Sequence, residues 1–406
     1  MFTKKEKRMF LDYAAGTPMS ERARTAYVNA LRYFGNPQAL HTEGLEAAQM
    51  LEHARRTICT LLGVKATELV FTSGGTEANN LALAGTLLKL EESGIAIADC
   101  HVVISSIEHP SVRDVFTPFI ARGLSLDMVV PNEQGEIKPE AVLKVLRENT
   151  VLVSVALVNS EIGTVQPLHA IHKLLKNRTP TVAGRTFGKI VLHTDACQGL
   201  YQSLIPQGLG VDLMTLDAGK MFGPRGVGAL YIRRGAMLSP VLRGGSQEHG
   251  LRPGTENVHL CAGFAAAFEE AVELRTSEEY RLAAIREELW RQLAEHIPGI
   301  IRNGTAKQQA PHILNISIPD INAEYVAMYL DQRGVALSTR SACLEGTEQI
   351  GSHVVAELAH AAGSIQGKWR EQNTLRFSFG RSTRMEDVST IVQKVADAVM
   401  TYQGFE

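Results

Sequence analysis

The stretch Leu69-Val70-Phe71-Thr72-Ser73-Gly74-Gly75-Thr76-Glu77-Ala78-Asn79-Asn80 decides the fold of this chain. It begins as an apolar run of strand length, turns at a pair of glycines and continues as a helical pattern to residue 90. Backbone N–H groups at the start of a helix, together with the Thr76 hydroxyl, converge on an anion such as phosphate. Glycines placed only for turn geometry are the alternative reading of these residues.

The same unit recurs along the chain, because apolar runs of strand length alternate with helical patterns. The predicted strands are 68–72, 101–105, 126–130, 151–158, 190–193, 213–216 and 228–232, and the predicted helices between them are 76–90, 110–121, 138–147 and 168–176. Strands rich in Val, Ile and Leu that alternate with helices predict a mostly parallel, seven-stranded sheet covered on both faces. Ligands of such sheets bind at the carboxyl ends of the strands.

Beyond residue 258 the pattern changes. A long helix is predicted at 259–296, followed by short strands at 312–317 and 374–379 and a last helix at 384–401. This segment predicts a smaller α+β unit. The polar stretch 177–188 within the first unit is predicted to be a surface insertion.

The length of 406 residues exceeds the size at which one hydrophobic core usually keeps growing, so two domains are expected. We predict a large α/β domain over residues 15–257. The smaller α+β domain is predicted to contain residues 258–406 and the N-terminal segment 1–14.

Composition excludes several classes of protein. With 45% hydrophobic and 21% charged residues and a net charge of −2, the chain is typical of globular proteins and lacks the basic surface that nucleic acid requires. No apolar run is long enough to span a membrane, and Met1 to Arg8 do not resemble a secretory signal. The five cysteines show no C-x-x-C spacing, so we expect neither disulfides nor a metal site, and a cytoplasmic location.

Two residues at predicted strand ends suggest cofactor chemistry. Asp195 would need a cationic partner if buried, and a protonated pyridine nitrogen is such a partner; a helix-capping aspartate is the alternative. Lys220 follows the strand at 213–216, and a lysine in a partly desolvated pocket can form an imine with an aldehyde. A solvated surface lysine is the alternative. With the phosphate-binding turn, these residues indicate a pyridoxal 5'-phosphate (PLP) enzyme.

A thiol completes this set. Cys343 lies in the small, polar, glycine-terminated run 337–346, which is typical of a loop that moves. Arg340 is placed to keep the Cys343 thiol ionised. The other cysteines are predicted to be small buried side chains, with Cys197 the closest of them to the cofactor.

Together these motifs resemble the cysteine desulfurases of the class V aminotransferase superfamily, in the branch used for iron–sulfur cluster assembly and nitrogen fixation. The resemblance covers nearly the whole chain. Its motifs are found, in the family's order, at 11–18, 34–37, 71–80, 107–109, 161–164, 195–198, 217–226, 252–257, 341–343 and 375–381. It implies the PLP-dependent transferase fold type I.

The resemblance also implies a role for individual residues toward the cofactor. His109 matches the histidine stacked on the pyridine ring and implicated in proton transfer, and Lys220 matches the lysine that binds the cofactor aldehyde. Thr255 matches a threonine that reaches the cofactor of the neighbouring subunit, which implies a homodimer. The remaining matches are Gly75 and Thr76 at the phosphate, Asp195 at the ring nitrogen and Gln198 at the ring hydroxyl.

For the substrate L-cysteine, the resemblance implies that Arg376 grips the carboxylate, with Asn36 as a second candidate. Cys343 matches the cysteine that takes the sulfur as a persulfide, leaving L-alanine. Sulfur transfer to an acceptor or scaffold protein would follow, in iron–sulfur cluster or thio-cofactor biosynthesis.

Three positions depart from the family pattern. Ser160 stands where an asparagine is usual, and Asp217 and Gly219 replace a serine and a histidine that normally help to hold the phosphate. An ionised Asp217 would repel a phosphate, by about 4 kcal/mol at 4 Å and an effective dielectric constant of 20. Arg225, Arg252 and His249 are candidates to compensate. We therefore predict that Asp217→Ser leaves cofactor binding unchanged or tighter.

These departures leave two alternative functions open. One is another PLP enzyme of the same fold, such as a selenocysteine lyase or an aminotransferase, which would not depend on Cys343 in the same way. The other is a non-catalytic scaffold in sulfur transfer.

Overall fold

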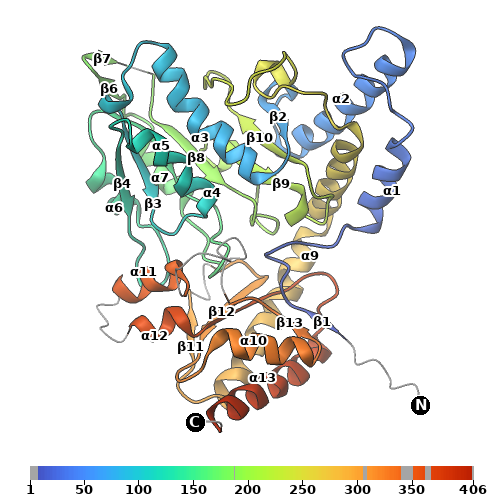
Figure 1. Cartoon of the computed structure of the whole chain (residues 1–406), viewed down its shortest axis with the longest axis vertical. Coiled ribbons are helices and arrows are strands. Elements are labelled where there is room, and N and C mark those ends of the chain that lie inside the picture. Colours follow the sequence, from blue (N-terminus) through green and yellow to red (C-terminus); the bar gives the residue numbers. More distant parts are fainter. Residues whose placement is uncertain (1–7, 187, 305–308, 340–350, 362–366, 405–406) are drawn as a thin grey trace.

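A seven-stranded sheet forms the centre of the larger part of the molecule (Figure 1). The computed structural model describes residues 8–186, 188–304, 309–339, 351–361 and 367–404. The strand order is β2 (Leu69–Thr72), β10 (Gly228–Ile232), β9 (Leu213–Asp217), β8 (Val191–Asp195), β5 (Thr150–Ser154), β3 (His101–Ser105) and β4 (Ser125–Val129). Only β10 runs antiparallel to its neighbours in this sheet. The predicted mostly parallel, seven-stranded sheet is therefore confirmed.

Most strands of the sheet are buried on both faces, which explains why they are rich in apolar residues, whereas the edge strand β4 is only partly buried. In β3, Val102 and Ile104 join one hydrophobic cluster, whereas Val103 between them joins the other. The first cluster includes residues of α3 (Gly75–Glu92), α4 (Pro110–Arg113) and α5 (Thr117–Ile120). The second includes residues of α2 (Thr42–Leu62), α6 (Pro139–Val145), α7 (Leu168–Leu175) and α9 (Val258–His296).

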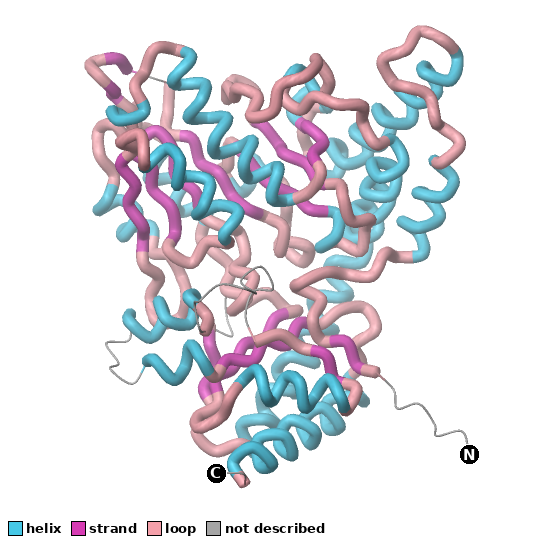
Figure 2. Tube along the Cα trace, viewed as in Figure 1, coloured by secondary structure: helices cyan, strands magenta, loops and turns pink. Residues whose placement is uncertain are grey.

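A smaller layer lies below this sheet in the view of Figure 2. Its antiparallel sheet has the order β11 (Ile301–Asn303), β12 (Ile313–Ser317) and β14 (Thr374–Ser378). The helices of this layer are α10 (Ala323–Gln332), α11 (His353–Ala361), α12 (Gly367–Gln372) and α13 (Val388–Gln403). The N-terminal segment contributes β1 (Met9–Phe10), which pairs in parallel with β13 (Val335–Ala336). The domain boundaries at 14/15 and 257/258 stay a prediction.

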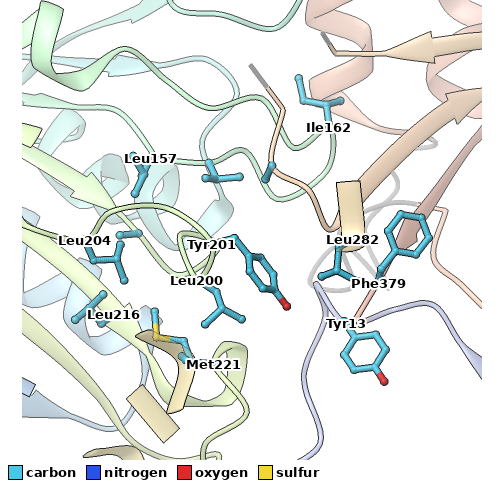
Figure 3. Close-up of a cluster of buried hydrophobic side chains, with 14 of the residues drawn as sticks. Tyr13, Leu157, Ile162, Leu200, Tyr201, Leu204, Leu216, Met221, Leu282 and Phe379 are labelled. Atoms are coloured by element: carbon cyan, nitrogen blue, oxygen red, sulfur yellow. The ribbon is translucent and has the colours of Figure 1, made fainter. Parts of the chain in front are cut away.

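The two layers share one hydrophobic core. Figure 3 shows Tyr201 and Leu200, which follow β8, directed toward Tyr13 of the N-terminal segment and Phe379 after β14. Helix α9 runs from one layer into the other (Figure 1). Its 39 residues span about 58 Å at 1.5 Å per residue, which is long enough to contact both layers. The smaller layer is therefore held next to the edge of the large sheet at which the parallel strands end.

Several elements differ from the sequence-based expectation. The helix predicted at 110–121 is broken into short segments, with Pro110 as the first residue of α4 and Pro118 as the second residue of α5, positions in the first helical turn that proline tolerates. The strand predicted at 151–158 ends at Ser154, and the chain then turns so that Leu157 N–H donates to Asp195 O. The insertion at 177–188 contains a hairpin of β6 (Thr181–Val182) and β7 (Arg185–Thr186).

Helices α1 (Glu21–Ala30) and α8 (Pro206–Leu209) complete the set of α-helices in the described residues. None of these described helices combines the length and the apolar character that crossing a membrane requires.

Candidate active site

The carboxyl ends of β2, β3, β5, β8 and β9 meet at one edge of the large sheet, because these strands are mutually parallel through the reversed β10. Asp195 and Asp217 are the last residues of β8 and β9, and the Ser73–Gly74 turn follows β2. The edge is where ligands of such sheets bind. The strand order therefore brings together chemistry-bearing residues that are far apart in the sequence.

A cavity of about 210 Å³ lies at this edge. It is lined by most of the residues predicted for the site, namely Gly75, Thr76, His109, Ser160, Asp195, Gln198, Asp217, Lys220 and Arg376. Arg376 belongs to β14 of the smaller layer, so the cavity is formed by both layers.

A chain of hydrogen bonds joins His109 to Asp195 inside the cavity wall. The Asn79 side-chain amide donates to Asp195 Oδ2 at 2.8 Å and to Ser111 Oγ at 2.9 Å. Ser111 in turn contacts His109 Nδ1 through its hydroxyl at 2.8 Å and donates its backbone N–H to the same nitrogen at 3.1 Å. Because Nδ1 accepts, the neutral ring carries its proton on Nε2. The network fixes both side chains in orientation.

Asp195 is held by neutral donors in this network. Besides Asn79, the backbone N–H of Cys197 donates to its Oδ1 at 2.9 Å. Behind it, His193 is completely buried, and burial lowers the pKa of its imidazole to about 4, so this ring is neutral. No described residue forms an ion pair with Asp195, so its carboxylate can accept a cationic group from the cavity.

Lys220 lies on a short 3₁₀ turn that follows β9. Its Nζ donates to the carbonyl oxygens of Ala14 at 3.0 Å and Ala15 at 2.8 Å. Gln198 also donates to Ala14 O, at 2.9 Å, and its Oε1 lies 3.3 Å from His312 Nε2. The N-terminal segment therefore positions the amine and the amide at the cavity.

Arg376 is only 2% exposed. Its guanidinium donates to Ser160 O at 3.0 Å and to Asp12 Oδ1 at 2.8 Å. Its Nε has no hydrogen-bond partner among the described residues. A guanidinium that lines the cavity and has donors beyond these two hydrogen bonds suits a carboxylate ligand.

The glycine turn holds a carboxylate. The backbone N–H of Gly75 donates to Asp217 Oδ2 at 2.9 Å, and the N–H of Gly219 donates to Asp217 Oδ1 at 2.8 Å. Cys197 packs beside this turn, and burial raises the pKa of its thiol well above the ordinary value, so the thiol stays protonated.

Two of the predicted residues that the structure describes do not line the cavity. Asn36 is exposed between α1 and α2, where its side chain accepts from Gln38 N–H at 2.9 Å. Thr255 is exposed in the segment before α9. Cys343, with Arg340, lies outside the described residues. The roles predicted for these residues stay predictions.

Sequence patterns did not single out Asn79, Ser111 or Asp12. Asn79 lies one helical turn after Gly75, on the face of α3 that points to the cavity, and this spacing is the signal that indicates it. Asp12 and Ser111 carry no such signal, because their partners come from distant segments. No group of acidic, histidine and cysteine side chains suited to a metal ion is found in the described part of the chain.

Comparison with known proteins places this cavity in context. Residues 9–391 match the family model described as Aminotransferase class-V. The cysteine desulfurase IscS of Dictyoglomus turgidum is 33% identical over 99% of this chain and 98% of its own length. The cysteine desulfurase IscS 1 of Archaeoglobus fulgidus is also 33% identical, over 95% of each chain.

Solved structures resemble the whole chain as well. A structure titled NifS-like protein superposes with a TM-score of 0.85 at 28% identity, covering 97% of this chain and all of that one. A structure of SspA in complex with cysteine superposes with a TM-score of 0.74 at 28% identity, covering 91% and 98% of the two chains.

Proposed function

The chain belongs to the class-V aminotransferase family, in its cysteine desulfurase branch, and we propose that its cavity binds PLP and L-cysteine for sulfur transfer to Cys343. Family and fold class, PLP-dependent transferase fold type I, are those expected from the sequence and are confirmed. Enzymes of this branch are in general PLP-dependent and convert L-cysteine to L-alanine. The observation that carries the proposal is the one cavity that Lys220, Asp195, His109 and Arg376 all line.

The ring end of the cavity fits PLP. Asp195 offers a carboxylate that no described cation neutralises, and Lys220 offers an amine that lines the same cavity. Gln198 would contact the ring hydroxyl, with the Gly75–Thr76 turn and Thr255 of a second subunit toward the phosphate. When bound, the cofactor would supply an electron sink for negative charge at the substrate Cα. Ser160 and Asp217 line the same space.

The remaining residues would act on the substrate. Arg376 would orient the L-cysteine carboxylate, with Asn36 as a second candidate, and His109 would move a proton between its Nε2 and the substrate. The Cys343 thiolate would attack the substrate sulfur, so that the C–S bond breaks and an S–S bond forms. Overall, enzyme thiol and L-cysteine give enzyme persulfide and L-alanine, which balances without an external oxidant.

A homodimer is part of this proposal. Helices α1 and α2 and the segment between them carry large exposed apolar side chains, with Leu40 92% and Phe34 79% exposed. Exposed apolar side chains gathered in one region are typical of a protein interface. A sulfur-acceptor or scaffold protein would then receive the persulfide sulfur, in iron–sulfur cluster or thio-cofactor biosynthesis.

Persulfide mapping tests the proposal. The PLP-supplemented protein is incubated with L-cysteine, alkylated without reductant and analysed by peptide mass spectrometry, alongside Cys343→Ala and Cys197→Ala. We expect the persulfide on Cys343 in the wild type and in Cys197→Ala, and none in Cys343→Ala. A persulfide on Cys197, whose side chain lines the cavity, would contradict the assignment.

A further inference from the structure

The Asp217 carboxylate accepts hydrogen bonds from backbone groups that a phosphate would use. Its two oxygens accept from Gly75 N–H at 2.9 Å and from Gly219 N–H at 2.8 Å. Gly75 begins α3, an 18-residue helix, and N–H groups in the first turn of a helix have no partner within the helix. A carboxylate at this position is also favoured by the helix dipole. The turn is therefore satisfied by a side chain of the protein itself.

Packing fixes the carboxylate against the turn. Gly74, the residue before Gly75, has a φ of 153°, a conformation that favours glycine. A Cβ built on Gly74 or Gly75 would lie 3.3 Å from Asp217 Oδ2, which is closer than most Cβ contacts, so the carboxylate lies close against the turn. A phosphate oxygen cannot accept from Gly75 N–H until this carboxylate moves.

Charge adds to the steric conflict. Among the described residues, no cation forms an ion pair with Asp217. Arg252, a candidate to compensate, is paired with Glu77 at 3.0 Å, and the guanidinium of Arg225 lies beside Gly16. A phosphate would therefore approach a carboxylate of like charge in a partly buried site, where repulsion is stronger than in water.

We propose that Asp217 is an internal substitute for the cofactor phosphate. It keeps the phosphate-binding turn formed when no phosphate is bound, and it has to be displaced when phosphate binds. The protein consequently gains little affinity from the phosphate of PLP, and discriminates weakly between PLP and unphosphorylated pyridoxal. The identity of the cofactor rests on the proposed function, whereas the competition between Asp217 and an anion does not.

Inorganic phosphate tests the competition without cofactor. Thermal unfolding of the cofactor-free full chain is measured in phosphate and in chloride of equal ionic strength. We expect phosphate to leave the midpoint of the wild type unchanged and to raise that of Asp217→Asn and Asp217→Ser, because only a ligand that binds the folded state stabilises it. Asp99→Asn, at an exposed aspartate outside the cavity, should behave as the wild type. Equal stabilisation of all four proteins would overturn the proposal.

Titration with PLP and with pyridoxal measures the contribution of the phosphate. The dissociation constant of pyridoxal divided by that of PLP isolates the contribution of the phosphate, since the ring contacts are common to both ligands. We expect this ratio to be at least about tenfold larger in Asp217→Asn and Asp217→Ser than in the wild type. Asp217→Asn keeps the size of the side chain, so a misfolded serine variant does not decide the outcome. A ratio unchanged in Asp217→Asn contradicts the proposal.

The phosphate experiment and the cofactor titration together distinguish a failure of this inference from a failure of the proposed function. If neither PLP nor pyridoxal binds any of the proteins, the proposed cofactor is wrong, and the response to inorganic phosphate still decides whether Asp217 blocks the turn. If both ligands bind the wild type and the variants with the same ratio, the cofactor is supported and the role of Asp217 is rejected.

Discussion

Among single residues, Asn79 controls the geometry on which the proposed chemistry depends. Its side chain is completely buried, and one amide group donates to both Asp195 and Ser111. Hydrogen bonds in a buried network matter most when one is lost, because the abandoned acceptor is left without water. Asn79 is thus a positioning residue that acts on the cavity through Asp195 and, by way of Ser111, through His109.

We expect Asn79→Ala to lower kcat for alanine formation by about tenfold to a hundredfold, which corresponds to an unmade buried hydrogen bond of about 1–3 kcal/mol. KM should change little, because Asn79 does not line the cavity. The control is Asn80→Ala, because the Asn80 amide donates to the backbone carbonyl of Thr76 one turn earlier in α3. Asn79→Ala with the kcat of the wild type would show that the network does not position these residues.

For single residues, the sequence predicts which side chains lie at the cavity but not which hydrogen-bond partners they have there. Lys220 and Asp195 follow predicted strands, and parallel strands bring them to one edge. By contrast, the sequence indicated only that Asp217 would repel a phosphate. That its carboxylate accepts from Gly75 and Gly219 depends on side-chain and turn geometry that no sequence pattern specifies.

Among the elements, the connection from β3 to α4 carries a buried acid. Glu108 is 1% exposed and accepts from Ala156 N–H at 2.8 Å, just beyond β5. Burial, together with the nearby Asp195 charge, raises the pKa of Glu108 to about 8. The folded protein therefore holds this proton over a pH range in which the unfolded chain has released it.

The pH dependence of stability follows from that difference. Because the folded-state pKa is raised, the contribution of Glu108 is present below its ordinary pKa and is lost as the pH rises toward about 8. Glu108 contributes at most about 1.4 kcal/mol per pH unit to the decline of the free energy of unfolding with rising pH. The free energy of unfolding, measured with urea between about pH 5 and 8, should decline less for Glu108→Gln than for the wild type. An unchanged slope, matching that of the exposed control Glu140→Gln, would contradict the buried, protonated state.

Helices and strands were predictable where the sequence has a clear hydrophobic pattern, either an apolar run of strand length or a long helical spacing. Most strands of the large sheet are buried on both faces and are therefore rich in apolar residues, and α9 was predicted within one residue of its start. Helix α2 was not predicted, although its buried residues Ala47, Leu51, Ala54, Ile58 and Leu62 follow a helical spacing. The two-residue strands β1 and β13 are too short for any period and form only because tertiary contacts pair them.

At the scale of the whole molecule, the N-terminal segment links the layers at the cavity. Asp12 pairs with Arg376 on β14 at 2.8 Å, while Ala14 and Ala15 accept from Lys220 beyond β9. The segment is continuous in sequence, so the relative position of the two layers and the width of the cavity are coupled. This coupling joins residues 364 positions apart, which pattern reading along the chain does not reveal.

The exposed apolar side chains between α1 and α2 give the proposed homodimer a direct test. Leu40→Asp and Phe34→Asp should shift the molar mass measured by light scattering from dimer to monomer, because a charge buried in an apolar interface is costly. Met328→Asp, at an exposed position on α10, serves as the control. A monomeric wild type would contradict the dimer, and a dimer in all variants would place the interface elsewhere.

Alanine release from L-cysteine tests the central claim most directly. The purified, PLP-supplemented protein is assayed with a thiol reductant, beside Lys220→Gln and Cys343→Ala. We predict that the wild type forms alanine over many turnovers and that both variants form none above background. Alanine from Cys343→Ala at the rate of the wild type would contradict the persulfide route, and no alanine from the wild type would contradict the assignment of this cavity as a desulfurase site.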